Sequence, residues 1–88
     1  MPISNGEDPK SHPGTIAYYE NRNGREINIG TERIENVPES MHFCQTAKGW
    51  IPVVKVVTII NNQGYPREII EYGPKNERLK STYTPASR

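Results

Sequence analysis

The sequence has few of the features on which small proteins rely for stability or for chemistry. It contains one cysteine, Cys44, among 88 residues, which excludes an internal disulfide and a zinc site built from paired cysteines. Only 33% of its residues are hydrophobic, and a chain this short buries a small share of its surface on folding. We therefore expect a single marginal core, for which self-association is the simplest reinforcement.

A long apolar stretch and a large net charge are also missing. No segment approaches the roughly 20 apolar residues of a membrane helix, and no basic start precedes an apolar run, so we expect a soluble, cytoplasmic protein that binds no membrane. The net charge is +1, which gives no global attraction to nucleic acid. Residues 1–40 hold four basic and seven acidic side chains (−3), against seven and three in residues 41–88 (+4). The chain is therefore bipolar along its sequence.

The first half of the chain predicts a β-hairpin. Residues 15–20 are rich in β-forming side chains, and residues 25–29 alternate polar and apolar. Between them, Asn23 and Gly24 form the dipeptide that accepts positive φ at both central positions of a tight turn. We expect Gly30 to end the second strand, so that residues 31–37 form a short edge strand or a loop.

The second half predicts another hairpin and the centre of the core. Residues 50–60 are the longest apolar run, and their β-branched content favours a strand, with regular pairing that starts after Pro52 or carries a bulge there. A turn at residues 61–64 then leads to a returning strand at residues 67–72. Residues 41–46 fit a further extended segment.

Together these segments predict a mostly β fold: a small antiparallel meander of about five strands, either an open sheet or a small barrel. Residues 14–80 form the single β domain, in which residues 74–80 are either a helical turn or the start of a last strand. Residues 1–13 have too few apolar groups to offset the entropy of ordering, and we expect a disordered arm there. Residues 81–88 are expected to form a flexible tail. Removing residues 1–12 should then leave the melting temperature nearly unchanged.

The sequence offers no convincing chemical site. His42 and Cys44 would share one face of a strand, but two ligands do not make a metal site, and His12, which could complete it, lies in the predicted arm. No serine or cysteine stands in a recognisable nucleophile motif, and no glycine-rich loop precedes a helix. We therefore expect neither enzymatic activity nor a cofactor or metal.

Two groups of residues are candidate binding sites. Tyr18 and Tyr19 are adjacent in a strand, so one faces the core and the other faces outward, where a rigid ring near an arginine has the composition of an interface hot spot. The candidate partner-binding residues are accordingly Tyr18, Tyr19, Arg22 and Arg25. The basic second half interleaves aromatic and cationic side chains, as base stacking and phosphate contact require, although we expect Trp50 to lie in the core. The candidate nucleic-acid-binding residues are Lys55, Arg67, Lys75 and Arg78.

These observations favour a small non-catalytic protein-binding module, either an accessory subunit or an inhibitor that occludes a larger macromolecule. The alternative is a nucleic-acid-binding β module that uses the basic second half. A third class is a small-ligand binder with its pocket at a subunit interface. Homodimerisation through a strand edge is compatible with all three classes, because an open sheet leaves two edges unpaired.

Overall fold

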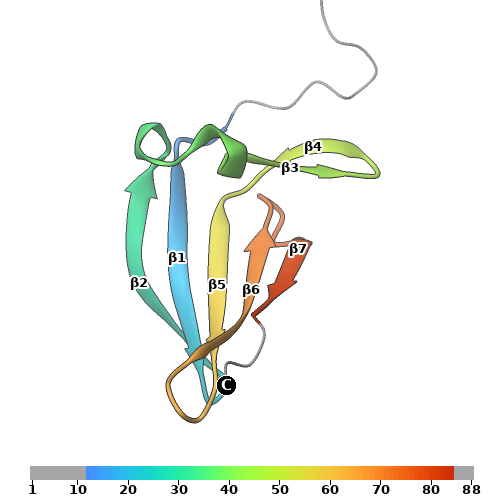
Figure 1. The fold of residues 1–88 in the computed structure, drawn as a ribbon. Helices are drawn as coiled ribbons and strands as arrows, with labels where there is room; N and C mark the ends of the chain where they lie inside the picture. Colours follow the sequence, from blue (N-terminus) through green and yellow to red (C-terminus); the bar gives the residue numbers. More distant parts are fainter. Residues whose placement is uncertain (1–11, 85–88) are drawn as a thin grey trace, which may run out of the picture.

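The computed structural model describes residues 12–84, and Figure 1 shows their arrangement as two sheets. No helix in this part of the chain is long and apolar enough to cross a membrane. Short 3-10 helices, η1 and η2, connect the second strand to the third. The elements in chain order are β1 (Thr15–Arg22), β2 (Arg25–Arg33), η1 (Ile34–Asn36), η2 (Glu39–Met41), β3 (Phe43–Thr46), β4 (Gly49–Pro52), β5 (Lys55–Ile60), β6 (Pro66–Tyr72) and β7 (Arg78–Tyr83).

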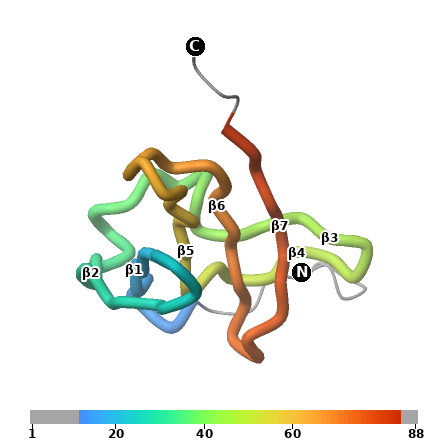
Figure 2. The backbone as a smooth tube through the Cα atoms, turned by 90° about the horizontal axis from the view of Figure 1, so that it is seen from below, coloured from blue at the N-terminus to red at the C-terminus, as the bar shows by residue number. Residues whose placement is uncertain are grey.

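The main sheet has five strands in the order β2-β1-β5-β6-β7, and it is open. The predicted mostly β fold with an open sheet is therefore confirmed, and the meander holds for β5, β6 and β7. The sheet is mixed, however, because β1 and β5 run parallel. Parallel neighbours cannot be joined by a tight turn; here the chain returns along β2 and then passes through η1, η2 and a separate hairpin of β3 and β4 before it enters β5. That hairpin extends past β7, as the view along the strands shows (Figure 2).

The first predicted turn is present, and its strand continues further than predicted. Asn23 and Gly24 have φ values of 56° and 83°, as a two-residue turn with positive φ at both positions requires. The prediction that Gly30 ends the strand is wrong, since β2 runs on to Arg33. The pairing register shifts between Tyr18 and Tyr19, which leaves Ile29 as the extra residue of a β-bulge. Gly30, with a φ of 154°, supplies the backbone freedom that the bulge needs.

The apolar run at residues 50–60 is divided between two strands. β4 ends at Pro52 and pairs with β3, whereas β5 begins at Lys55 in the main sheet. Pro52 has no N–H to donate, and the chain changes sheets directly after it. Trp50 was expected in the core, but it lies on the protruding hairpin with 40% of its surface exposed. The run therefore reflects one buried strand and a short strand outside the main sheet.

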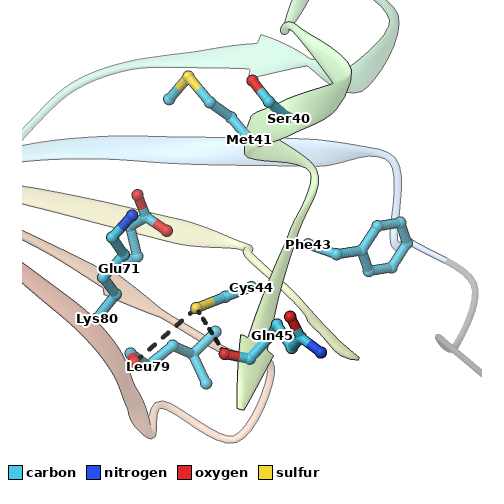
Figure 3. A pocket seen from close by; sticks show the side chains of 8 residues that line it. All are labelled: Ser40, Met41, Phe43, Cys44, Gln45, Glu71, Leu79 and Lys80. Atoms are coloured by element: carbon cyan, nitrogen blue, oxygen red, sulfur yellow. Dashed lines mark hydrogen bonds between the residues drawn. The ribbon is translucent and has the colours of Figure 1, made fainter. Parts of the chain in front are cut away.

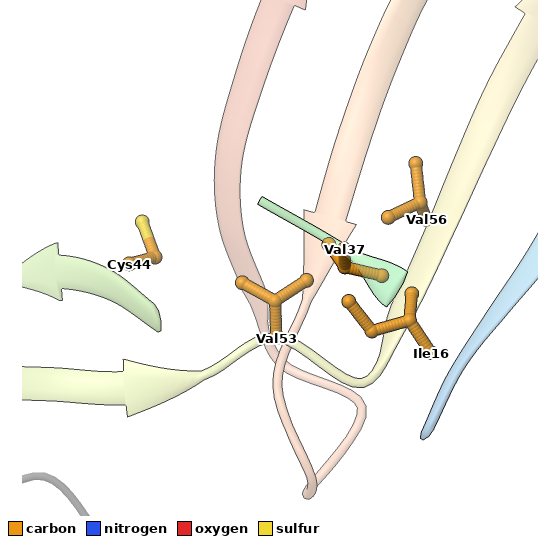
Figure 4. Close-up of a cluster of buried hydrophobic side chains, with 5 residues drawn as sticks. All are labelled: Ile16, Val37, Cys44, Val53 and Val56. Carbon is orange, nitrogen blue, oxygen red and sulfur yellow. The ribbon is translucent and has the colours of Figure 1, made fainter. Parts of the chain in front are cut away.

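The core lies where the long connection covers one face of the main sheet. Ile16 and Val56 of the sheet pack with Val37, Val53 and Cys44 from the connection (Figure 4). Val57, which faces the opposite way from Val56, is also buried. β5 is thus covered on both faces, and this explains why apolar residues occupy both of its faces.

Both ends of the described chain are attached to the sheets. His12 Nε2 lies 2.8 Å from the carbonyl oxygen of Val53, and the Gly14 N–H donates to His12 Nδ1 at 2.9 Å. Of the predicted arm, residues 1–11 lie outside the described residues. At the other end β7 includes residues 78–83, so the structure has the last strand rather than a helical turn. The expected tail begins within this strand, and residues 85–88 lie outside the described residues.

We predict that Ile16→Ala lowers the free energy of unfolding by about 2–4 kcal/mol, because the truncation leaves a cavity in the fully buried centre of the core. Ile27→Ala is the matched control, since Ile27 is 49% exposed on an edge strand. Urea denaturation of both variants measures the difference. Equal costs for the two substitutions would contradict the assignment of the core.

We also predict that His12→Ala lowers the free energy of unfolding by about 1–2 kcal/mol, because it removes two partly buried hydrogen bonds. This replaces the expectation that residues 1–12 can be removed without effect. Lys48→Ala, at an exposed turn, is the control. If thermal and urea denaturation find His12→Ala as stable as the control, His12 does not anchor the start of the domain.

Candidate functional site

The structure places the two adjacent tyrosines on opposite faces of the main sheet. Tyr18 packs against the core cluster, where burial and, to a smaller extent, the Glu32 carboxylate raise the pKa of its phenol. Tyr19 lies on the other face, and its ring centroid is 4.9 Å from Lys55 Nζ. Neither ring is therefore a free anchor for a partner, because one belongs to the core and the other holds a lysine.

Lys55 is enclosed by groups from three neighbouring strands. Its ammonium nitrogen lies 3.1 Å from Glu26 Oε1 of β2 and 5.2 Å from the ring centroid of Tyr72 of β6, in addition to Tyr19 of β1. The side chain is only 23% exposed. A cation between two aromatic faces and a carboxylate has its charge compensated within the domain. Lys55 is thus a structural residue, and the sequence did not reveal Glu26 and Tyr72 as its neighbours.

Arg22 and Arg25 lie at the tip of the first hairpin, beside the turn of the second hairpin. Arg22 pairs with Ile60 across the parallel strands, so the two turns meet at one end of the sheet (Figure 1). Tyr65 lies in the second turn with 66% of its surface exposed, and Arg67 follows it at the start of β6. Tyr83 is 72% exposed and ends β7 at the same end, where the next N–H, of Thr84, donates to the Arg67 carbonyl. These residues share one end of the sheet but not one face, because the registers place Tyr83 on the face of Tyr19 and both Arg22 and Arg25 on the face of Tyr18. We call this set the hairpin-tip surface: Arg22, Arg25, Tyr65, Arg67 and Tyr83.

The four candidate nucleic-acid-binding residues are not brought together. Lys55 is enclosed on one sheet face, and Arg67 belongs to the hairpin-tip surface. Lys75 and Arg78 lie at the opposite end of the sheet, in the turn before β7 and at the start of that strand. The basic character of the second half of the sequence is thus distributed over three separate places in the structure.

A cleft of about 530 Å³ opens between the β3–β4 hairpin and the main sheet (Figure 3). Cys44 lies in its wall, with Sγ 3.9 Å from the carbonyl oxygens of Gln45 and Leu79. Burial raises the pKa of the Cys44 thiol, and the nearby Glu71 carboxylate adds to this effect while Lys80 opposes it. The thiol therefore stays protonated at neutral pH and is a poor nucleophile.

His42 and Cys44 do not share a strand face. His42 directly follows η2 with helical backbone angles, and its Nε2 lies 2.6 Å from the Val37 carbonyl oxygen. Its ring centroid is 6.1 Å from that of His12, whose two nitrogens are both in hydrogen bonds. Within residues 12–84 no three His, Cys, Asp or Glu side chains are grouped as a metal site requires.

Comparison with known proteins adds no assignment to this geometry. No protein-family model, curated protein or solved structure matches the chain. The candidate site consequently depends on the residues of the chain itself, and the exposed tyrosines and arginines of the hairpin-tip surface are the strongest feature among them.

We predict that Lys55→Met lowers the free energy of unfolding by about 1–2 kcal/mol, since it removes the cation from between two rings and leaves Glu26 without its partner. Lys48→Met, at an exposed turn, is the matched control and should cost less than about 0.5 kcal/mol. Urea denaturation of both variants makes the comparison. A Lys55→Met protein as stable as the control would show that the lysine is free for an external ligand.

Proposed function

We propose that this protein is a non-catalytic protein-binding module that docks its partner at the hairpin-tip surface. The observation that carries the proposal is that Tyr65 and Tyr83, the two most exposed large apolar side chains of residues 12–84, lie at the same end as three arginines. Tyrosine and arginine are the residue types enriched at the energetic centres of protein interfaces. A rigid sheet end that presents both types needs little reordering when a partner binds.

The charges of this surface indicate the chemistry of the partner. Arg22 Nε lies 3.0 Å from Glu20 Oε1, an ion pair within the hairpin itself. Arg25 and Arg67 have no ion-pair partner among residues 12–84. A partner that presents carboxylates around an apolar patch would complement these two arginines and the tyrosine rings. By covering such a patch, the protein would act as an accessory subunit or as an occluding inhibitor.

Nucleic-acid binding is less well supported by the same geometry. Stacking on Tyr65 with phosphate contact at Arg67 would use two suitable groups. The remaining candidate cations do not join them, because Lys55 is compensated by Glu26 and Lys75 and Arg78 lie at the far end. A continuous basic track for a phosphate backbone is therefore absent from the described surface at the hairpin tips.

The test is an affinity capture from lysate of the native source with three forms of the protein, each with and without nuclease. Arg25→Glu/Tyr65→Ala alters the hairpin-tip surface. Arg78→Glu/Trp50→Ala is the matched control, because it reverses one exposed arginine and truncates one exposed aromatic ring outside that surface. Mass spectrometry identifies and quantifies the captured proteins.

We expect one protein to be captured in stoichiometric amount by the wild type and by the control, with or without nuclease, and to be lost with the hairpin-tip variant. Loss with the control variant alone would contradict the proposed surface. Loss of every partner on nuclease treatment, with retention falling steeply between 50 and 200 mM salt, would favour the nucleic-acid alternative instead.

A further inference from the structure

β2 is an edge strand whose outer side has no neighbour in the described chain. Natural edge strands are protected from pairing with another chain by lysine, proline or a β-bulge, and β2 has the bulge at Ile29 but neither lysine nor proline. Its sequence begins Arg25-Glu26 and ends Glu32-Arg33, so its charges sum to zero. Ile27 and Ile29, between these charged ends, are 49% and 55% exposed. The strand thus combines a free edge, exposed apolar side chains and no net charge.

The hydrogen bonds within the hairpin decide which backbone groups of β2 face outward. Arg22 and Arg25 flank a two-residue turn, so they form a hydrogen-bonded pair, and the alternation directs the N–H and C=O groups of Glu26 and Asn28 away from β1. At the other end the Ile34 N–H donates to the Gly14 carbonyl oxygen. Ile34 therefore faces β1, and by the same alternation the backbone N–H and C=O groups of Arg33 and Thr31 point away from β1.

The outward residues have even numbers before the bulge and odd numbers after it, because the bulge adds one residue to β2. Ile29 and Gly30 together oppose Tyr18, so they occupy the place of one residue in the alternation. The outward positions are therefore Glu26, Asn28, Thr31 and Arg33, arranged symmetrically about the bulge. Their pairing partners on β1 place all four side chains on the sheet face that carries Tyr19.

We propose that two copies of this chain form a symmetric dimer by antiparallel pairing of their β2 edges about the bulge. In this register the outward groups of Glu26 face those of Arg33 of the second copy, and Asn28 faces Thr31. Twofold symmetry repeats each contact, so two Glu26–Arg33 ion pairs flank the ladder. They add to the pairs within each copy, where Glu26 lies 3.1 Å from Lys55 and Arg33 lies 2.8 Å from Glu35. The exposed Ile29 side chains of the two copies meet near the symmetry axis, and the two five-stranded sheets become one continuous sheet.

The registers shifted by one residue in either direction are disfavoured. A shift toward the hairpin turn sets Arg25 against Arg33 and Glu26 against Glu32, which places like charges opposite each other four times. A shift in either direction also sets an inward-facing residue of one copy against an outward-facing residue of the other, so the backbone bonds cannot form. The charge pattern of the strand and the phase of its hydrogen bonds therefore select the same register.

This dimer is independent of the proposed function. Antiparallel pairing of the two β2 strands directs the two sets of hairpin tips to opposite ends of the combined sheet, so each copy keeps its own hairpin-tip surface accessible. A protein that dimerises but captures no partner would contradict only the proposed function. A protein that captures a partner but stays monomeric would contradict only the dimer.

Sedimentation equilibrium of the full chain tests the proposal, together with four variants. Glu26→Arg and Arg33→Glu each replace two attractive contacts by two repulsive ones. The double variant Glu26→Arg/Arg33→Glu exchanges the charges and restores attraction. Arg78→Glu, the same change on the other edge strand, is the control.

We expect the wild type and Arg78→Glu to dimerise with the same dissociation constant, and each single variant at the β2 edge to raise it at least tenfold. The double variant should recover most of this loss. Circular dichroism must show that the single variants remain folded, because within each chain Glu26 also pairs with Lys55 and Arg33 with Glu35. A wild type that is monomeric at all concentrations would overturn the proposal, and so would folded single variants that dimerise like the wild type.

Discussion

The parallel pairing of β1 with β5 holds the two halves of the chain in one sheet. Six consecutive residue pairs, from Ala17–Lys55 to Arg22–Ile60, join the first hairpin to the second-half meander. β2 brings the chain back to the end of the sheet where β1 starts, and because β5 pairs with the other side of β1, the connection from β2 to β5 must pass over the start of β1. That connection carries Val37 and Val53 onto Ile16, and thereby makes the core.

The same pairing determines what the surface residues can do. It brings Lys55 between Tyr19 and Tyr72 and next to Glu26. The ammonium group of Lys55 and the ring of Tyr19 therefore contact each other and are not free to bind a partner. The pairing also aligns the tips of the two hairpins at one end, where Tyr65 joins Arg22 and Arg25. A site composed of residues from both halves of the chain thus results from one backbone register.

The sequence was informative where local chemistry decides the structure. The Asn23-Gly24 turn, the second hairpin and the mostly β fold follow from turn residues and β-branched runs. Composition does not reveal which strands become neighbours, and the parallel pair was missed for that reason. Trp50 was placed in the core because it adjoins an apolar run, yet Pro52 ends its strand before the run enters the main sheet. The candidate binding residues were predictable to the same extent. Arg22 and Arg25 lie together, as neighbours of one turn must, whereas Tyr18 and Tyr19 make contacts that depend on the tertiary fold.

Interstrand nuclear Overhauser effects test the parallel register of β1 and β5. We expect backbone contacts that place Ala17 near Lys55, Tyr19 near Val57 and Asn21 near Ile59, in the same order along both strands. Contacts in the opposite order, or none between the two strands while each hairpin shows its own, would contradict it. The core, the enclosed lysine and the hairpin-tip surface would then all have to be assigned anew.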